Sequence, residues 1–309
     1  PPAKPLFVNS FQKESIEWKK VRNLYRQKIN EPLINVKTHR GNSIKVTQEH
    51  PFLVARQEGL VWVKSSQLRI GDYICMASYI NSTHNLCLGQ DLPSLLAWQI
   101  TEGWESSKKY ACSITQKGEG CFILQDLAQK VLKSTVKIQK PKKGCTFIRF
   151  YSNAYGNLLT SLGYEWGHKS ANKKMPSAFS CLDRPTMAKF LQIMFDAEGH
   201  AGTCGVEFSS ASKRLIEQVK SLLLVFGIRS SFSVMRKCAT NGSRIYRTYY
   251  RIMISGEDLR IFEKEIKFFY KYKNDVLEKS VSKKHNPNTG IPYISNIQNL
   301  IKLGATNSM

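Results

Sequence analysis

Two acidic residues stand in the same unusual setting, each at the end of an apolar stretch with helical spacing. Glu102 precedes Gly103, and Glu198 precedes Gly199. A carboxylate in the last turn of a helix faces the negative end of the helix dipole, at a cost of a few tenths to about 1 kcal/mol. An isolated Glu-Gly pair usually marks an ordinary helix end with a glycine cap. Because the unfavourable placement occurs twice at matched positions, we interpret it as a functional site.

Carboxylates that face each other require a cation. Oxygen ligands that leave room for water and a substrate phosphate suit Mg²⁺. A pair of such sites suits in-line displacement at phosphorus, in which metal ions activate water and stabilise the leaving oxygen. The two glutamates are therefore predicted to bind Mg²⁺, or Mn²⁺ in its place.

The glutamates belong to an internal repeat. Its copies begin at Asp91-Leu92-Pro93 and Asp183-Arg184-Pro185, where aspartate is expected to cap a helix and proline to lie in its first turn. Glutamate follows the aspartate after 11 residues in one copy and 15 in the other. That difference of four is about one helical turn, so both glutamates should have similar orientations. The small residue Ala97 would permit the two helices to pack together.

Matching elements follow each motif helix. In the first copy we predict a strand, a helix, two strands and a helix at 110–116, 122–133, 134–140, 146–151 and 153–162. In the second copy the corresponding segments are 205–210, 212–226, 230–237, 244–254 and 257–266. The first 80 residues instead read as short β segments, at 33–37, 44–47, 60–64 and 73–76. The sequence thus predicts an α+β protein with a duplicated unit and a β-rich N-terminal part.

Composition narrows the class of partner. The chain of 309 residues carries 46 Lys and Arg against 23 Asp and Glu, a net charge of +23, which favours polyanions. It has no apolar run long enough to span a membrane and no signal peptide. Its eight cysteines show no zinc-binding spacing and are interpreted as reduced thiols. We expect a monomer in the cytoplasm or an organellar matrix, neither membrane-bound nor secreted.

Residues 95–103 and 191–199 resemble the two motifs of double-motif LAGLIDADG homing endonucleases, and residues 88–275 resemble that family throughout. The second motif is close to the family pattern at residues 195–199, whereas the first is looser at residues 98–103. The resemblance implies two pseudo-symmetric αββαββα halves, at 88–170 and 171–275. It also implies divalent metal at Glu102, Gly103, Glu198 and Gly199, and a saddle of strands over the major groove of double-stranded DNA.

In such enzymes a lysine near the end of each half lies beside the metal. Aligning the two copies places Lys169 opposite Lys273, with Lys173, Lys174 and Lys271 as alternatives. A lysine there would polarise the water shell or hold the phosphate charge.

Strand alternation selects candidate DNA contacts, because neighbouring residues point to opposite faces. With Ile148, Phe150, Ile252 and Ile254 assigned to the core, the residues predicted to face DNA are Lys137, Gln139, Arg149, Tyr151, Lys237, Arg247, Tyr249 and Arg251. Arg, Lys and Gln on a two-stranded ribbon reach base edges or phosphates. For each of them a plain solvated position is an equal alternative.

Residues 1–80 look like part of an intein splicing (Hint-like) domain. Residues 43–54 contain the Thr-x-x-His pattern of a splicing block at Thr47 and His50, which together would protonate an amide leaving group. The chain opens at Pro1 and shows no terminal His-Asn, so we expect this pair to be inactive here. The tail at 276–309 resembles the stretch that follows the endonuclease in inteins.

The sequence therefore predicts a site-specific, Mg²⁺-dependent endonuclease that cuts both strands of a long pseudo-palindromic DNA site. The resemblance adds 3′ overhangs and mobility of the encoding intein or intron. Three alternatives stay open: a DNA-binding protein of the same fold without cleavage, an intein fragment in protein splicing, and an RNA maturase.

Overall fold

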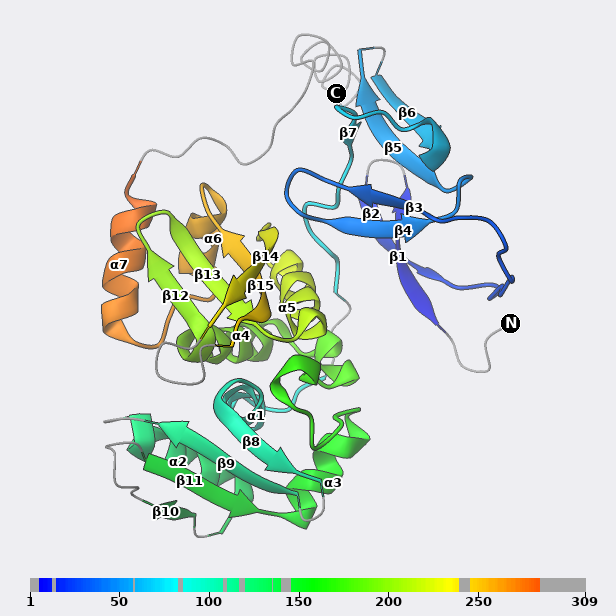
Figure 1. Cartoon of the computed structure of the whole chain (residues 1–309). Helices are drawn as coiled ribbons and strands as arrows, with labels where there is room; N and C mark the ends of the chain where they lie inside the picture. Colours follow the sequence, from blue (N-terminus) through cyan, green and yellow to red (C-terminus); the bar gives the residue numbers. More distant parts are fainter. Residues whose placement is uncertain are drawn as a thin grey trace, which may run out of the picture. The chain divides into compact units, whose positions relative to one another are not determined.

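The computed structural model describes residues 6–12, 15–57, 59–82, 86–107, 110–116, 120–134, 136–139, 146–238 and 245–283. These residues fall into two compact units, one ending at Asn81 and one beginning at Ser82 (Figure 1). The structure confirms the predicted α+β class. No helix among the described residues is long and apolar enough to cross a membrane.

The unit from Ser82 onward contains the same series of seven elements twice. The first half comprises α1 (Asp91–Glu102), β8 (Gly103–Ser106), β9 (Ala111–Gln116), α2 (Gly120–Leu132), β10 (Lys137–Gln139), β11 (Thr146–Tyr151) and α3 (Asn153–Ser161). The second half comprises α4 (Arg184–Glu198), β12 (Gly199–Gly202), β13 (Gly205–Ser210), α5 (Lys213–Val225), β14 (Ser231–Lys237), β15 (Arg247–Ile254) and α6 (Asp258–Glu265). A further helix, α7 (Lys271–Val281), follows. Each half is thus αββαββα.

The two sheets correspond strand for strand. Their orders are β10-β11-β9-β8 and β12-β13-β15-β14, and all pairs are antiparallel. Gly103 pairs with Ile114 in one sheet, as Gly199 pairs with Phe208 in the other. The strands β8 and β12, which begin at these glycines, escaped prediction because each has only four residues and little apolar character.

The motif helices α1 and α4 join the halves. They pack against each other between the two sheets (Figure 1). Ala97 is fully buried, as are Leu95 on α1 and Phe190 and Met194 on α4, in one apolar cluster that includes residues of both halves. Burying a side chain of this size stabilises the fold by about 1.5–3 kcal/mol. The helix ends are therefore held rigidly relative to each other.

The starts of the motif helices differ from each other. Asp183 caps α4, since its carboxylate accepts a hydrogen bond from the backbone N of Thr186 at 3.0 Å. The expected cap at Asp91 is wrong: this residue is already helical, and it forms an ion pair with Lys130 at 2.8 Å. An aspartate in the first turn still interacts favourably with the helix dipole.

The unit ending at Asn81 is built from β strands, as predicted. It contains the hairpins β1 (Phe7–Gln12) with β2 (Ser15–Lys20) and β3 (Ile34–Lys37) with β4 (Ser43–Val46). A three-stranded sheet follows, formed by β5 (Pro51–Arg56), β6 (Gly59–Lys64) and β7 (Tyr73–Ile74), with a 3-10 turn η1 (Ser65–Gln67). Of the predicted tail, 276–281 belong to α7, and residues from 284 onward lie outside the described residues.

Candidate active site

Glu102 and Glu198 lie together at the junction of the two halves. They are the last residues of α1 and α4, whose packing brings their ends together. Burial and the charge of Glu102 raise the pKa of Glu198 to about 7. Burial also raises the pKa of Glu102, against the effect of two nearby lysines. Glu198 keeps solvent access, so the surrounding protein shifts its pKa without enclosing it completely.

The donor set of this junction fits a hard divalent cation. No hydrogen bond from another described residue contributes to the pKa shift of either glutamate, although the charges of Lys173 and Lys273 lower both pKa values. Across the described residues no cluster of three or more His, Cys, Asp or Glu residues that could hold a metal ion is present. Mg²⁺ is usually held by one or two carboxylates, with water and substrate phosphate completing its shell. The site thus suits Mg²⁺ and would be completed by a phosphate ligand.

A lysine crosses the end of each motif helix. Lys173 Nζ donates to the backbone O of Gly103 at 2.8 Å and of Thr101 at 3.2 Å. Lys273 Nζ donates to the backbone O of Gly199 at 2.7 Å, and also to the backbone O of Asp196 at 2.7 Å and of Phe195 at 3.4 Å. Cations at a helix C-terminus satisfy its last carbonyls and offset the dipole. These lysines therefore stabilise the placement of the glutamates.

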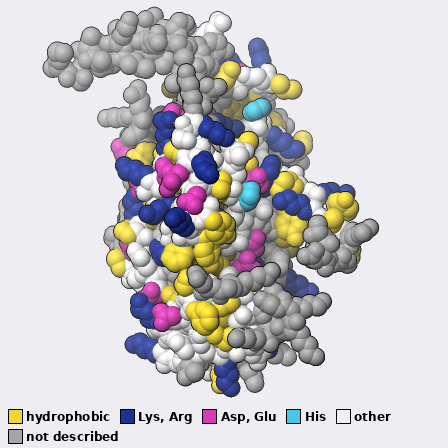
Figure 2. Space-filling view, turned by 90° about the vertical axis from the view of Figure 1, so that its left-hand side faces the viewer, with side chains coloured by type: hydrophobic (Ala, Val, Ile, Leu, Met, Phe, Trp, Pro, Cys, Tyr) yellow, Lys and Arg dark blue, Asp and Glu magenta, His cyan; other side chains and the backbone are white. Residues whose placement is uncertain are grey.

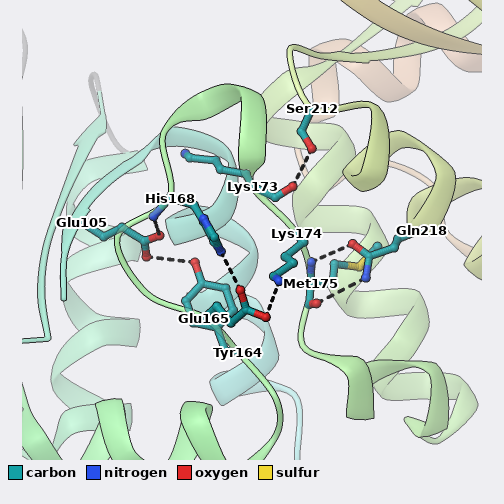
Figure 3. Close-up of polar contacts among 9 residues, drawn as sticks. All are labelled: Glu105, Tyr164, Glu165, His168, Lys173, Lys174, Met175, Ser212 and Gln218. Atoms are coloured by element: carbon teal, nitrogen blue, oxygen red, sulfur yellow. Dashed lines mark hydrogen bonds and ion pairs between the residues drawn. The ribbon is translucent and has the colours of Figure 1, made fainter.

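The first of these lysines is Lys173 and not Lys169, which corrects the sequence alignment. Lys169 is exposed and precedes the 3-10 turn η2 (Ser170–Asn172). Lys174 pairs with Glu165 (Figure 3). Lys271 is an exposed residue at the start of α7. The error arose because Lys273 lies inside a helix, whereas Lys173 lies in the linker of residues 162–183, whose irregular path no periodicity predicts.

The two glycines are required by close packing. Both have extended φ values, −87° at Gly103 and −89° at Gly199, and not the left-handed conformation expected of a glycine cap. A Cβ at either position would lie 2.4 Å from a backbone oxygen, that of Gln99 or of Phe195. Their carbonyls accept the lysine hydrogen bonds, so their predicted metal ligation stays a prediction.

A cavity of about 380 Å³ adjoins Glu102. Its lining includes Asp196 and the aromatic residues Trp98, Tyr270 and Tyr272. The rings of Tyr270 and Tyr272 stack at 5.8 Å. A second cavity of about 220 Å³, between the linker and α5, contains none of the paired glutamates or lysines. Of these two cavities, the one beside Glu102 is therefore the one that adjoins the glutamate pair.

On the first sheet the predicted alternation is present. Ile148 and Phe150 are buried, while Arg149 and Tyr151 are exposed. Lys137 and Gln139 are also exposed, and Lys137 lies directly opposite Arg149. The outward face thus carries two cationic side chains in register.

The second sheet presents a different face. Lys237 lies opposite Arg247, and both are exposed. Tyr249 and Arg251 are half-buried, and Arg251 contacts Glu207 at 3.3 Å. Figure 2 shows lysine and arginine side chains spread among acidic ones rather than gathered in one patch on the face that it presents. The basic character of the chain alone therefore does not locate its partner.

Thr47 and His50 share one turn between β4 and β5. The backbone N of His50 donates to the O of Thr47 at 3.2 Å, and Ser65 Oγ donates to the same oxygen at 2.6 Å. The His50 ring packs edge-on against Phe52 at 5.2 Å. The sequence also has internal His-Asn pairs at 84–85 and 285–286, and all four of these residues lie outside those described.

Several known proteins are similar to parts of this chain in sequence. It is 29% identical over 274 residues to a replication factor C small subunit of Thermococcus kodakarensis, covering 87% of this chain and 29% of that protein. It is 25% identical to the DNA-directed RNA polymerase subunit Rpo1C of Methanocaldococcus jannaschii, covering 95% of this chain and 37% of that protein. The chain thus spans well under half of either relative.

A crystal structure of I-DmoI in complex with DNA and Ca is similar, with 17% identity and a TM-score of 0.41 over 61% of this chain and 97% of that one. Residues 185–267 match the family described as LAGLIDADG-like domain. The match runs from the start of α4 to just beyond α6, and so includes Glu198 and the whole second sheet. Residues 185–267 are therefore similar to a LAGLIDADG-like domain.

Proposed function

We propose that the protein is a metal-dependent, site-specific DNA endonuclease that cuts both strands of its target. The observation that carries this proposal is the pair of facing glutamates, each at a motif helix end crossed by a lysine. Two neighbouring carboxylates repel each other, and a cation between them would stabilise their charged forms. In a basic chain, a carboxylate pair with flanking lysines suits a bridging phosphate of nucleic acid.

Each side chain has a distinct role in this proposal. Glu102 and Glu198 would hold Mg²⁺ or Mn²⁺, which supplies activation of water and stabilisation of the leaving oxygen. Lys173 and Lys273 would hold positive charge beside the phosphate. Gly103 and Gly199 would permit the close turn from helix to strand that aims the glutamates.

The electrostatics connect each lysine to the opposite half. Burial lowers the pKa of Lys173, and the carboxylates of Glu105 and Glu198 oppose this more strongly than that of Glu102. Burial also lowers the pKa of Lys273, and there Asp196 and Glu102 act more strongly than Glu198. Because one lysine crosses the end of each motif helix beside the glutamate pair, we infer two sites, one for each strand of a duplex.

The sheets would read the DNA, the first through Lys137, Gln139, Arg149 and Tyr151, and the second through Lys237, Arg247, Tyr249 and Arg251. Strand register shows that equivalent positions carry different chemistry. In the first sheet Gly103 pairs with Ile114, which in turn pairs with Ile148. In the second sheet Gly199 pairs with Phe208, which in turn pairs with Ile252. The residues that follow the two isoleucines, Arg149 and Met253, are therefore equivalent. We therefore expect the half-sites of the target to differ in sequence, with only partial palindromy.

The two relatives support an origin as an inserted element. They differ in name and function, yet almost the whole of this chain matches a minor part of each. We propose that the chain belongs to an intein that such host proteins carry, with the unit before Ser82 as its Hint-like part and mobility of its gene as its role. One chain supplies both halves, so we propose a monomer that leaves 3′ overhangs.

The test is cleavage of a genomic plasmid library with Mg²⁺ or with EDTA, followed by sequencing of the broken ends. We expect breaks at one recurrent site that require metal and disappear in Glu198→Gln. Retention of specific DNA without breaks would instead identify a binding protein of the same fold. Preferential cutting or binding of structured RNA would favour a maturase.

A further inference from the structure

A buried carboxylate lies behind the first site, and both of its oxygens accept hydrogen bonds from the protein. Glu105 is on β8 and is 8% exposed. Its Oε2 accepts hydrogen bonds from Gln99 Nε2 at 2.8 Å and from the Tyr164 hydroxyl at 2.9 Å. Its Oε1 accepts from the backbone N of His168 at 3.2 Å. Glu105 therefore fixes two points of the linker that leads to Lys173 (Figure 3).

Further contacts hold the linker on both sides of Lys173. His168 and Lys174 both contact Glu165. The backbone O of Lys173 accepts from Ser212 Oγ at 2.6 Å. Gln218 on α5 holds Met175 through two hydrogen bonds. Its Oε1 accepts from the backbone N of Met175 at 2.9 Å, and its Nε2 donates to the backbone O of Met175 at 3.3 Å. The path before Lys173 thus depends on Glu105, and the path after it depends on the second half.

The second half holds its lysine with a carboxylate from another place. Asp196 on α4 accepts from the backbone N of Phe269 at 2.7 Å and of Tyr270 at 3.4 Å, just before Lys273. In strand register the position of Glu105 is occupied by Ala201 in the second half. The two carboxylates therefore do the same work from positions that are not equivalent in the repeat.

We propose that Glu105 is the positioning residue for Lys173, and that Asp196 is its counterpart for Lys273. The predicted effect of these residues on DNA cleavage rests on the proposed function. The two scissile phosphates of a duplex are related by an approximate twofold axis, as are the two lysines. Each buried carboxylate should therefore control the cutting of one strand.

The experiment uses the full chain and a duplex of the recovered target with a different label on each strand. Single-turnover rates for both strands are compared among the wild type, Lys173→Met, Glu105→Gln and Asp196→Asn. Glu105→Gln should slow the strand that depends on Lys173 by about 10- to 100-fold, because small misplacements of a reacting group have effects of that size. The other strand should change by less than about twofold, and Asp196→Asn should give the reverse pattern.

Two comparisons separate positioning from a general loss of stability. The double variant Glu105→Gln with Lys173→Met should cut no more slowly than Lys173→Met alone, since a residue acting through Lys173 has nothing left to position. Equal slowing of both strands, or additive effects, would overturn the proposal. Tyr164→Phe, which removes one hydrogen bond to Glu105, replaces Glu105→Gln in the experiment if that variant does not fold. It should slow the strand that depends on Lys173, but by less.

A second readout does not require cleavage. Lys173 is 9% exposed and should react slowly with acetic anhydride in the wild type. Glu105→Gln should raise its acetylation several-fold, measured by peptide mass spectrometry, and leave Lys273 unchanged. Unchanged labelling of Lys173 would overturn the inference. A wild type that cuts no DNA, with the labelling pattern as expected, would reject the proposed function and keep the positioning role.

Discussion

The two halves share a backbone but not an interior. Three residues before its glutamate, the first half has Gln99 and the second has Phe195. Gln99 donates to Glu105 and accepts from the Tyr155 hydroxyl at 3.0 Å, in a buried polar network. Phe195 packs against Phe208 and against another ring on α6.

This difference shows that the site does not depend on one way of filling the core. A buried polar network is as acceptable as an aromatic cluster if every member has its hydrogen-bond partner. What both halves keep is the helix end, the close glycine turn and the lysine across it. The predictions that follow test where the halves are equal and where they differ.

The largest expected effect tests whether the halves share their metal. Glu102→Gln and Glu198→Gln should each lower cleavage of both strands by about 10³-fold or more, because a metal ligand supplies several kcal/mol of transition-state stabilisation. DNA affinity measured in Ca²⁺ by gel shift should stay within about tenfold. One strand cut at the wild-type rate would show that the two sites load metal independently.

The glycine turns should be equally intolerant. Gly103→Ala and Gly199→Ala each place a Cβ 2.4 Å from a backbone oxygen, so each should lower the free energy of unfolding by about 3 kcal/mol. Urea denaturation measures this loss. Gly202→Ala is the matched control, because its Cβ would approach no atom more closely than 3.4 Å, the distance to the His200 side chain. A large difference between the first two variants would mean that one turn can relax.

The interiors should respond differently to loss of the residue that distinguishes them. Gln99→Leu leaves the Tyr155 hydroxyl buried without its acceptor and should destabilise the protein by about 2 kcal/mol. Adding Tyr155→Phe should recover part of this loss. In the second half Phe195→Leu should destabilise through packing alone, and its effect should add to that of Tyr155→Phe. If Tyr155→Phe were coupled as strongly to Phe195→Leu as to Gln99→Leu, the two interiors would not differ in the way described.

The smallest effect is a dependence of stability on pH without metal. The pKa of Glu198 is about 7 in the folded protein against an ordinary 4.5, so the folded state binds more protons than the unfolded chain between these values. The free energy of unfolding in EDTA should therefore fall as pH rises through this window. Glu198→Gln should flatten that slope, and the exposed control Glu278→Gln should not. Equal slopes for the wild type and Glu198→Gln would contradict the assignment.

The sequence predicted the repeat and most of its elements because these depend on local periodicity. The strands at 205–210 and 146–151 have the predicted bounds, and Ile148 and Ile252 are core residues. The glutamates were found because they break a local rule.

The features that the sequence did not predict depend on contacts between residues far apart in the chain. Lys173 is selected by a linker whose path depends on Glu105, and Glu105 lies 63 residues from the backbone it fixes at His168. Nothing in the local pattern marks Glu105, since it follows an exposed tryptophan in a strand of four residues. Asp196 stands within the second motif, but its contacts with the backbone near Lys273 are just as distant in sequence.

The hydroxyl of Ser212 has a consequence for the order in which the protein becomes competent during its synthesis. It donates to the backbone of Lys173 and accepts from Leu215 N at 3.2 Å, as the cap of α5. A nascent chain that ends before Ser212 lacks this anchor and also lacks Gln218, although it already contains Glu198. We therefore expect the backbone at Lys173 to reach its final path only after α5 has folded.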